Sequence, residues 1–165
     1  MKSQKKGKAI FLDRDGVLNR ERGEHTWLLE DFILNDGVVE ALTEFQVRGY
    51  LLIVISNQSG IAKGIYTVQE VDYLHLHLRR VLGNHGIELT EIYYCPHHPS
   101  VSNCLCRKPG SQMLEKALAR FQLDPSQSYF IGDAQRDADA GRKAGVQPLL
   151  IEPNSSMRSV LSLVK

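Results

Sequence analysis

Residues 50–60 read Tyr-Leu-Leu-Ile-Val-Ile-Ser-Asn-Gln-Ser-Gly, and this stretch decides the fold class. Its apolar part, 50–55, shows no polar alternation, which is typical of a strand covered by helices on both faces. Polar residues begin abruptly at Ser56, where we expect the strand to end. A buried strand followed by a polar turn predicts a parallel sheet of the α/β class.

Outward from this stretch, short apolar runs alternate with helical patterns. The runs predict further strands at 9–12, 92–94, 129–131 and 148–151. The helical patterns lie at 38–47, 67–82, 111–121 and 136–144, and a short amphipathic helix is expected at 155–164. Thr67 and Glu70 form a capping-box pattern, and Ser111 is the expected cap of the third helix. The alternation predicts one domain over 1–165, a Rossmann-like parallel sheet with helices on both faces.

Composition excludes several classes of protein. A length of 165 residues with 42% apolar and 24% charged content is ordinary for a water-soluble domain. A net charge of +1 gives no bulk reason to expect nucleic acid or a membrane surface as partner. The first residues, 1–8, contain lysines but no apolar segment of a signal peptide, and no run is long enough to span a bilayer. We therefore expect a cytoplasmic monomer.

Acidic residues follow two of the predicted strands. Asp13 and Asp15 come directly after the first strand, and Asp133 comes after the fourth, with Asp137 one helical turn further on. Ligands of parallel sheets bind at the carboxyl ends of the strands, so these side chains are expected to meet. Oxygen ligands of this kind suit Mg2+ shared with a phosphate group.

Phosphate-binding groups accompany these acids. Ser56 and the turn 59–60 offer hydroxyl and amide donors, and Lys108 offers a compact positive charge. An oxygen nucleophile, a metal, a hydroxyl and a lysine together indicate phosphoryl transfer. Taken singly, each motif has a simpler explanation as a turn, a helix cap or a solvated loop residue. Their common placement at strand ends favours the functional interpretation.

The segment 95–109 contains all three cysteines, at 95, 104 and 106, with His97 and His98 between the first two. Three thiolates and one imidazole predict a tetrahedral zinc site, and the spacing alone leaves open which histidine binds. Such a site has no open position for a reacting water, so a structural role is favoured. The metal would hold the loop that carries Arg107 and Lys108. A nucleic-acid-binding finger is disfavoured because the chain lacks a basic, aromatic face.

The order of these motifs resembles the haloacid dehalogenase superfamily. Four longer runs, 11–16, 56–64, 93–99 and 104–109, look like the D,D-heptose 1,7-bisphosphate phosphatases of that superfamily. The histidinol-phosphate phosphatases are similar and share the zinc loop. The resemblance implies an Mg2+-dependent sugar bisphosphatase without a large cap domain, with release of the 7-phosphate as the expected reaction. Another small phosphomonoester phosphatase, or a silent zinc-stabilised binding module, remains an alternative.

The resemblance also implies residue roles. Asp13 would be the nucleophile and Asp15 the acid and base, while Asp13, the Asp15 carbonyl and Asp133 would hold Mg2+. Ser56 and Lys108 would bind the transferring phosphoryl group. Contacts to the rest of the substrate would come from Asn57, Gln58, Ser59 and Arg107. Structural zinc would be held by Cys95, His97, Cys104 and Cys106, which leaves His98 as a bystander.

Two departures from the family pattern concern the substrate pocket. Ala134 stands where relatives often carry a lysine directly after the fourth-motif aspartate. The loop 21–27 also lacks a Gly-Tyr-Val segment that close relatives have. The expected partner is thus a phosphorylated sugar, with its identity and anomer left open.

Overall fold

The computed structural model describes residues 6–165, so the first five residues of the lysine-containing start lie outside it. Five strands alternate with four α-helices in the described chain. The strands are β1 (Lys8–Leu12), β2 (Tyr50–Asn57), β3 (Glu91–Cys95), β4 (Tyr129–Gly132) and β5 (Gln147–Leu150). The helices are α1 (Val38–Val47), α2 (Val68–Gly83), α3 (Gln112–Arg120) and α4 (Gln135–Lys143). Three 3-10 turns are η1 (Leu29–Asp31), η2 (Pro125–Gln127) and η3 (Met157–Val160).

All strands of the sheet are parallel, in the order β3-β2-β1-β4-β5. The chain moves outward from β1 to β3 and then crosses back, so that β4 lies on the other side of β1. Leu12 pairs with Val54 of β2 and with Ile131 of β4. The residues that follow β1, β2 and β4 therefore lie at the same edge of the sheet. The parallel sheet and its strand order confirm the predicted Rossmann-like α/β fold.

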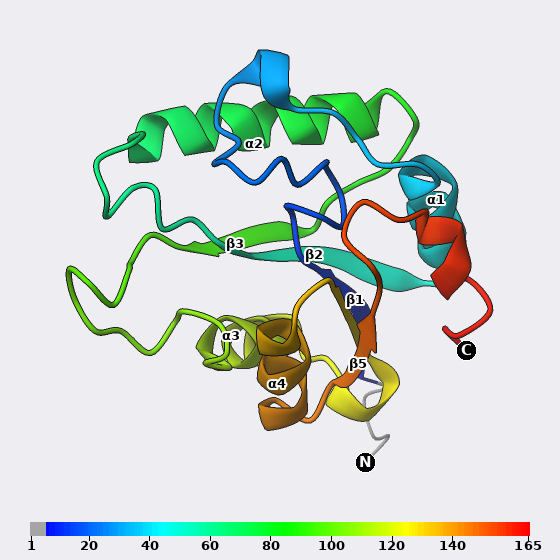
Figure 1. The fold of residues 1–165 in the computed structure, drawn as a ribbon. Helices are drawn as coiled ribbons and strands as arrows, with labels where there is room; N and C mark the ends of the chain where they lie inside the picture. The colour runs from blue at the N-terminus through cyan, green and yellow to red at the C-terminus, as the bar shows by residue number, and fades with distance from the viewer. Residues whose placement is uncertain (1–5) are drawn as a thin grey trace.

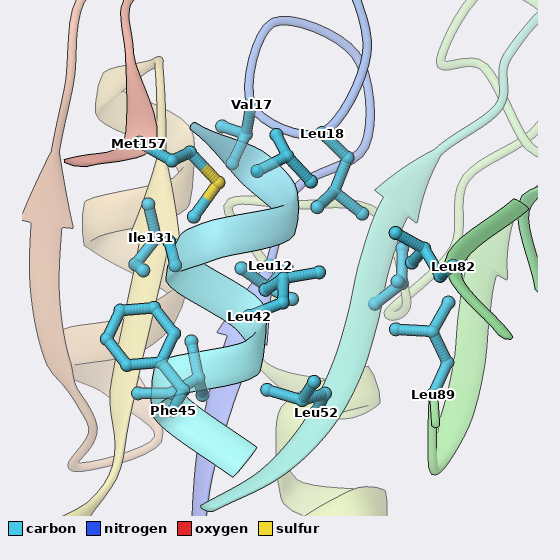
Figure 2. Packing of buried hydrophobic residues seen from close by; sticks show 14 of the residues in the cluster. Leu12, Val17, Leu18, Leu42, Phe45, Leu52, Leu82, Leu89, Ile131 and Met157 are labelled. Atoms are coloured by element: carbon cyan, nitrogen blue, oxygen red, sulfur yellow. The ribbon is translucent and has the colours of Figure 1, made fainter. Parts of the chain in front are cut away.

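Helices cover both faces of the sheet: α1 and α2 lie on one, α3 and α4 on the other (Figure 1). Each face of the sheet forms a hydrophobic core with its helices. Alternate residues of a strand belong to different cores, because neighbouring side chains of a strand point to opposite faces. Leu12 and Leu52 belong to one core together with Phe45 of α1, and Figure 2 shows this cluster. Phe11 and Ile53 belong to the other core. This double burial explains why residues 50–55 of β2 are apolar, and the strand continues past its expected end at Ser56 to Asn57.

The capping residues expected from the sequence stand at the starts of α2 and α3, but only one of them makes its capping bond. Thr67 Oγ1 accepts a hydrogen bond from the Glu70 amide at 3.2 Å, and the Glu70 carboxylate accepts one from the Thr67 amide at 2.8 Å. This confirms the capping box. Ser111 stands at the N-cap of α3 but makes no capping bond, because its hydroxyl donates to Glu115 at 2.6 Å instead.

The expected C-terminal helix at 155–164 is wrong. Only η3 forms there, although Val160 and Val164 are buried in the core. Arg48 donates to the carbonyl oxygens of Leu161 and Val164, at 3.0 and 2.9 Å. Tertiary contacts of these carbonyls replace the hydrogen bonds of a regular helix. Within residues 6–165, no helix combines the length and the apolar character that crossing a membrane requires.

Candidate active site

Three carboxylates meet beyond the ends of the adjacent strands β1 and β4. Asp13, Asp133 and Asp137 each offer an oxygen, and these oxygens all lie within 4.8 Å of one another. A glycine is required beside them: a Cβ on Gly16 would lie 1.9 Å from Oδ2 of Asp133, and Gly16 has a φ of +90°. The predicted pair Asp13 and Asp133 is therefore brought together, and Asp137 joins it.

Lys108 reaches this cluster with a side chain that is 1% exposed. Its ammonium nitrogen lies 2.9 Å from Oδ1 of Asp13, and it donates to the carbonyl of Ile55 at 3.0 Å. A 2.7 Å contact with Oδ1 of Asp137 is an ion pair without hydrogen-bond alignment. Burial works to lower the pKa of Lys108, but the two carboxylates raise it above its ordinary value. The lysine is thus held as a cation.

The side chain of Asn57 holds the backbone of Lys108. Its amide oxygen accepts a hydrogen bond from the Lys108 N–H at 3.0 Å, and its amide nitrogen donates to the Lys108 carbonyl at 3.2 Å. Asn57 is the last residue of β2, whereas Lys108 belongs to the Cys/His loop that follows β3. This pair of bonds therefore joins the loop to the central part of the sheet.

The acidic cluster fits a divalent cation. Burial raises the pKa of Asp13 to about 7, an effect that Lys108 opposes and the carboxylates of Asp137 and Asp133 reinforce. A second cation beside Asp13 would relieve this repulsion. Oδ1 of Asp133 is buried without a hydrogen-bond partner among the described residues. Asp137 is already engaged, because its Oδ2 accepts from the amides of Asp133 and Ala134 at 3.2 and 3.1 Å. All three carboxylates could hold a metal, and Asp13 and Asp133 are the two that the sequence predicts as Mg2+ ligands.

Asp15 has a different environment, rich in hydrogen-bond donors. Its Oδ1 accepts from Arg14 and from Asn19, each at 2.9 Å, and its Oδ2 accepts from Gln58 at 3.1 Å. Burial acts to raise the pKa of Asp15, but the Arg14 guanidinium and these hydrogen bonds outweigh it and lower the pKa. The pKa values of Asp13 and Asp15, the two acids of one motif, are therefore shifted in opposite directions.

Gln58 and Ser56 lie inside the structure. Ser56 is fully buried, and its hydroxyl oxygen accepts from the Gln58 amide at 2.8 Å. The other end of the Gln58 side chain accepts from the Tyr66 hydroxyl at 2.6 Å. Gln58 thus uses both polar ends within the protein while still bordering the cavity described next.

A cavity of about 290 Å³ opens over these groups. Its lining includes the predicted site residues Asp13, Asp15, Asn57, Gln58, Ser59, Arg107 and Lys108. The loop 21–27 contributes Glu21, Gly23, Glu24, His25 and Thr26. Arg136, at the start of α4, supplies a further cation that sequence reasoning did not single out. The cavity lining therefore combines acids from the strand ends and from the loop 21–27 with the cations Arg107, Lys108 and Arg136.

The Cys/His loop forms a second cluster. Cys95, His97, Cys104 and Cys106 offer ligand atoms that all lie within 4.8 Å of one another. The Cys95 sulfur lies 3.4 Å from Nδ1 of His97 and 3.1 Å from the Cys106 sulfur, too far for a disulfide. His98 is turned away and contacts the Ser100 hydroxyl at 2.6 Å. The four clustered residues could hold a metal ion.

Comparison with known proteins decides the family. A model described as HAD-hydrolase-like matches residues 105–163. The D-glycero-beta-D-manno-heptose-1,7-bisphosphate 7-phosphatase of Haemophilus ducreyi is 41% identical over 146 residues, which is 85% of this chain and 80% of the relative. The D-glycero-alpha-D-manno-heptose-1,7-bisphosphate 7-phosphatase of Campylobacter jejuni is also 41% identical, over 88% of this chain and 83% of its own. This chain belongs to the D-glycero-D-manno-heptose-1,7-bisphosphate 7-phosphatase family.

The crystal structure of a heptose-bisphosphate phosphatase from B. bronchiseptica, complexed with magnesium and phosphate, has the same fold. Its TM-score is 0.84 at 29% identity, and the match covers 94% of this chain and 86% of that one. The present member of the heptose-bisphosphate phosphatase family is thus a phosphatase of the haloacid dehalogenase superfamily. The described residues, 6–165, include no large cap domain.

Besides Arg136, two groups of this heptose-bisphosphate phosphatase family member have no role predicted from the sequence. Asp137 is expected one helical turn after Asp133, and the structure pairs it with Lys108. Arg14, the middle residue of the Asp-x-Asp motif, has no exposed surface and contacts His75 of α2. The only available signal was the spacing of His75, which lies four residues after Val71 on the apolar face of its helix.

Proposed function

We propose that this phosphatase removes the 7-phosphate from D-glycero-D-manno-heptose 1,7-bisphosphate. Both alpha- and beta-specific relatives are similar to this chain, so either anomer can be the substrate. The observation that carries the proposal is the position of Lys108 between Asp13 and Asp137 at the base of the cavity. A phosphoryl group entering there would meet a nucleophile and a cation together.

The reaction has two steps. In the first, a carboxylate oxygen of Asp13 attacks phosphorus, the bond between phosphorus and the sugar oxygen breaks, and Asp15 gives that oxygen a proton. In the second, Asp15 takes a proton from water, the water oxygen attacks phosphorus, and phosphate leaves with Asp13 restored. Mg2+ held by Asp13, Asp133 and the Asp15 carbonyl would supply positive charge to the phosphate oxygens.

The Lys108 ammonium group borders the cavity and would bind the transferring phosphoryl group. The Ser56 hydroxyl is assigned to the same phosphoryl group from the family resemblance, because Ser56 itself is fully buried beneath the cavity lining. Arg107 borders the cavity and donates to the His97 carbonyl at 3.3 Å, which leaves other nitrogens of its guanidinium for the second phosphate. Asn57, Gln58 and Ser59 border the same space. The amide groups of Asn57 and Gln58 already bond within the protein, so these two residues would contribute shape to the substrate site.

Zinc is the metal that suits the Cys/His cluster, because three thiolates and an imidazole are its usual structural set. Its four ligands close the coordination sphere, so it would stabilise the loop and take no part in the reaction. The loop leads directly to Arg107 and Lys108. Zinc would therefore order the two cations that meet the phosphates.

A phosphate-release screen tests the proposal. The purified protein, with Mg2+, is offered both anomers of heptose 1,7-bisphosphate, histidinol phosphate and fructose 1,6-bisphosphate. We expect the highest kcat/KM for one heptose anomer, and almost no release by Asp13→Asn with unchanged folding. A preference for histidinol phosphate would contradict the sugar assignment. Undiminished turnover by Asp13→Asn would remove the proposed nucleophile.

A further inference from the structure

Arg14 is the largest side chain that the described protein buries completely. It stands between the two acids of the catalytic motif, and its backbone amide donates to Oδ1 of Asp13 at 2.8 Å. A guanidinium is never neutral in a protein, so its burial requires partners for its donors. Three groups supply them: Asp15, the carbonyl of Thr26 and the ring of His75.

The contact with Asp15 is a planar fork. Nε of Arg14 donates to Oδ1 at 3.2 Å, and Nη2 donates to Oδ1 and Oδ2 at 2.9 and 3.0 Å. Two nitrogens on one carboxylate fix the direction of the carboxyl plane as well as its distance. Nη2 also donates to the Thr26 carbonyl at 2.7 Å, which joins the fork to the loop that lines the cavity.

His75 completes the environment of Arg14 from the other side. Its Nε2 lies 3.2 Å from Nη1 of Arg14. Because arginine can only donate, Nε2 must accept, and the ring proton must reside on Nδ1. Burial first, and then the Arg14 charge, lower the pKa of His75 to about 3. The ring is therefore a neutral acceptor.

Elements remote from the cavity hold His75 in place. It lies on α2 and meets the ring of Tyr94 edge-on, with 5.4 Å between centroids. Tyr94 belongs to β3, and its hydroxyl donates to Asp72 of α2 at 2.9 Å. Neither His75 nor Tyr94 borders the catalytic cavity. Arg14 contacts both His75 and Asp15, and it is therefore the group through which His75 can reach the cavity lining.

We propose that Arg14 is a positioning residue that sets the direction of the Asp15 carboxyl group, and that His75 acts through Arg14. The proposal rests on the proposed function, in which Asp15 exchanges protons with the leaving oxygen and with water. Such transfers need a donor and acceptor aligned within hydrogen-bond reach. His75 supports that alignment without contacting the substrate.

The test separates positioning from general support of the fold by changing the leaving group. His75→Leu removes the acceptor of Arg14, whereas His75→Gln can offer an amide oxygen in its place. The heptose bisphosphate releases an alkoxide that needs a proton, and acetyl phosphate releases a carboxylate that needs none. We expect His75→Leu to lower kcat/KM for the heptose bisphosphate by about tenfold or more, with a much smaller change for acetyl phosphate. His75→Gln should recover most of the lost activity.

A double-mutant cycle gives the same distinction with one substrate. In an Asp15→Asn background, His75→Leu should cause little further loss, because the group it positions is already gone. His85→Leu, on an exposed residue beyond α2, is the matched control. Arg14→Lys keeps the charge but loses the fork, and it should reproduce the leaving-group pattern if His75→Leu does not fold. Thermal unfolding accompanies each measurement.

Equal losses on both substrates, or additive losses in the cycle, would overturn the positioning role. Failure of the proposed function has a different signature. In that case the wild-type protein itself would release no phosphate from the heptose bisphosphate, whatever residue stands at position 75.

Discussion

Lys108 and Asp137 form a buried ion pair of 2.7 Å, in which neither side chain is more than 1% exposed. The lysine comes from a loop and the aspartate from the first turn of α4, so the pair joins two segments that are 29 positions apart. The same ammonium nitrogen contacts Asp13, the proposed nucleophile, at 2.9 Å. One cation thus serves the stability of the fold and the proposed chemistry.

Replacing Lys108 should therefore affect both properties. Lys108→Met leaves Asp13 and Asp137 as buried carboxylates without their cation, and breaking such a pair costs about 3–5 kcal/mol. We expect the free energy of unfolding in urea to fall by that amount and phosphate release to be lost. Lys63→Met, on an exposed lysine, is the control. An unchanged urea midpoint would show that the buried pair contributes nothing to stability.

Gly16→Ala tests the carboxylate cluster. The new Cβ would lie 1.9 Å from Oδ2 of Asp133, so Asp133 must move. We expect a higher Mg2+ concentration for half-maximal activity and a loss of about 1–2 kcal/mol in unfolding free energy. Gly64→Ala is the matched control, because Gly64 also has a positive φ, +69°, and no atom lies within 4 Å of its added Cβ. Equal Mg2+ dependence in both variants would contradict a role for Asp133 in metal binding.

Removal of the loop metal should reduce activity indirectly. A thiol-competing chelator, followed by excess Mg2+, should lower the unfolding temperature and slow phosphate release, because the loop before Lys108 loses its support. Cys104→Ser should have the same two effects. Ser102→Ala alters an exposed residue of the same loop and should have neither. If chelation leaves temperature and rate unchanged, the loop needs no metal.

The buried His75 predicts an acid-linked loss of stability. Its folded pKa is about 3, against 6.5 when exposed, because of burial, Arg14 and Arg79, with Asp15 opposing. Below pH 6.5 the unfolded chain therefore takes up a proton that the folded chain does not. Between pH 7 and pH 5 this should lower the free energy of unfolding by about 2 kcal/mol. Urea titrations of the wild type and of His75→Gln measure the difference.

In that comparison His75→Gln should lose less stability than the wild type over the same pH interval. The Tyr94 ring and the exposed His85 are unchanged in this variant, so His85→Gln serves as the control for histidines in general. Parallel pH profiles for the wild type and His75→Gln would show that His75 becomes protonated in the folded protein.

The strand-end residues could be predicted because local patterns define them. An apolar run such as 50–55 marks a strand, and the first polar residue after it marks the edge where ligands bind. Arg14 could not be predicted in this way, because one charged residue between two acids gives no sign that it is buried. The prediction of a helix at 155–164 was wrong for a related reason. Arg48, more than 100 positions away in the sequence, donates a hydrogen bond to the carbonyl of Leu161.

The hydrogen bond from Arg14 to the loop 21–27 bears on how the sequence of that loop can change among related proteins. Arg14 binds the loop through the main-chain carbonyl of Thr26, a group that every amino acid offers. Side chains such as Glu21, Glu24 and His25 can therefore be exchanged, by evolution or by design, while the Thr26 carbonyl keeps its bond to Arg14 and so its link to Asp15, the proposed acid and base. Substitutions in the loop 21–27 could adapt the cavity to new leaving groups while Arg14 and Asp15 keep their relative positions.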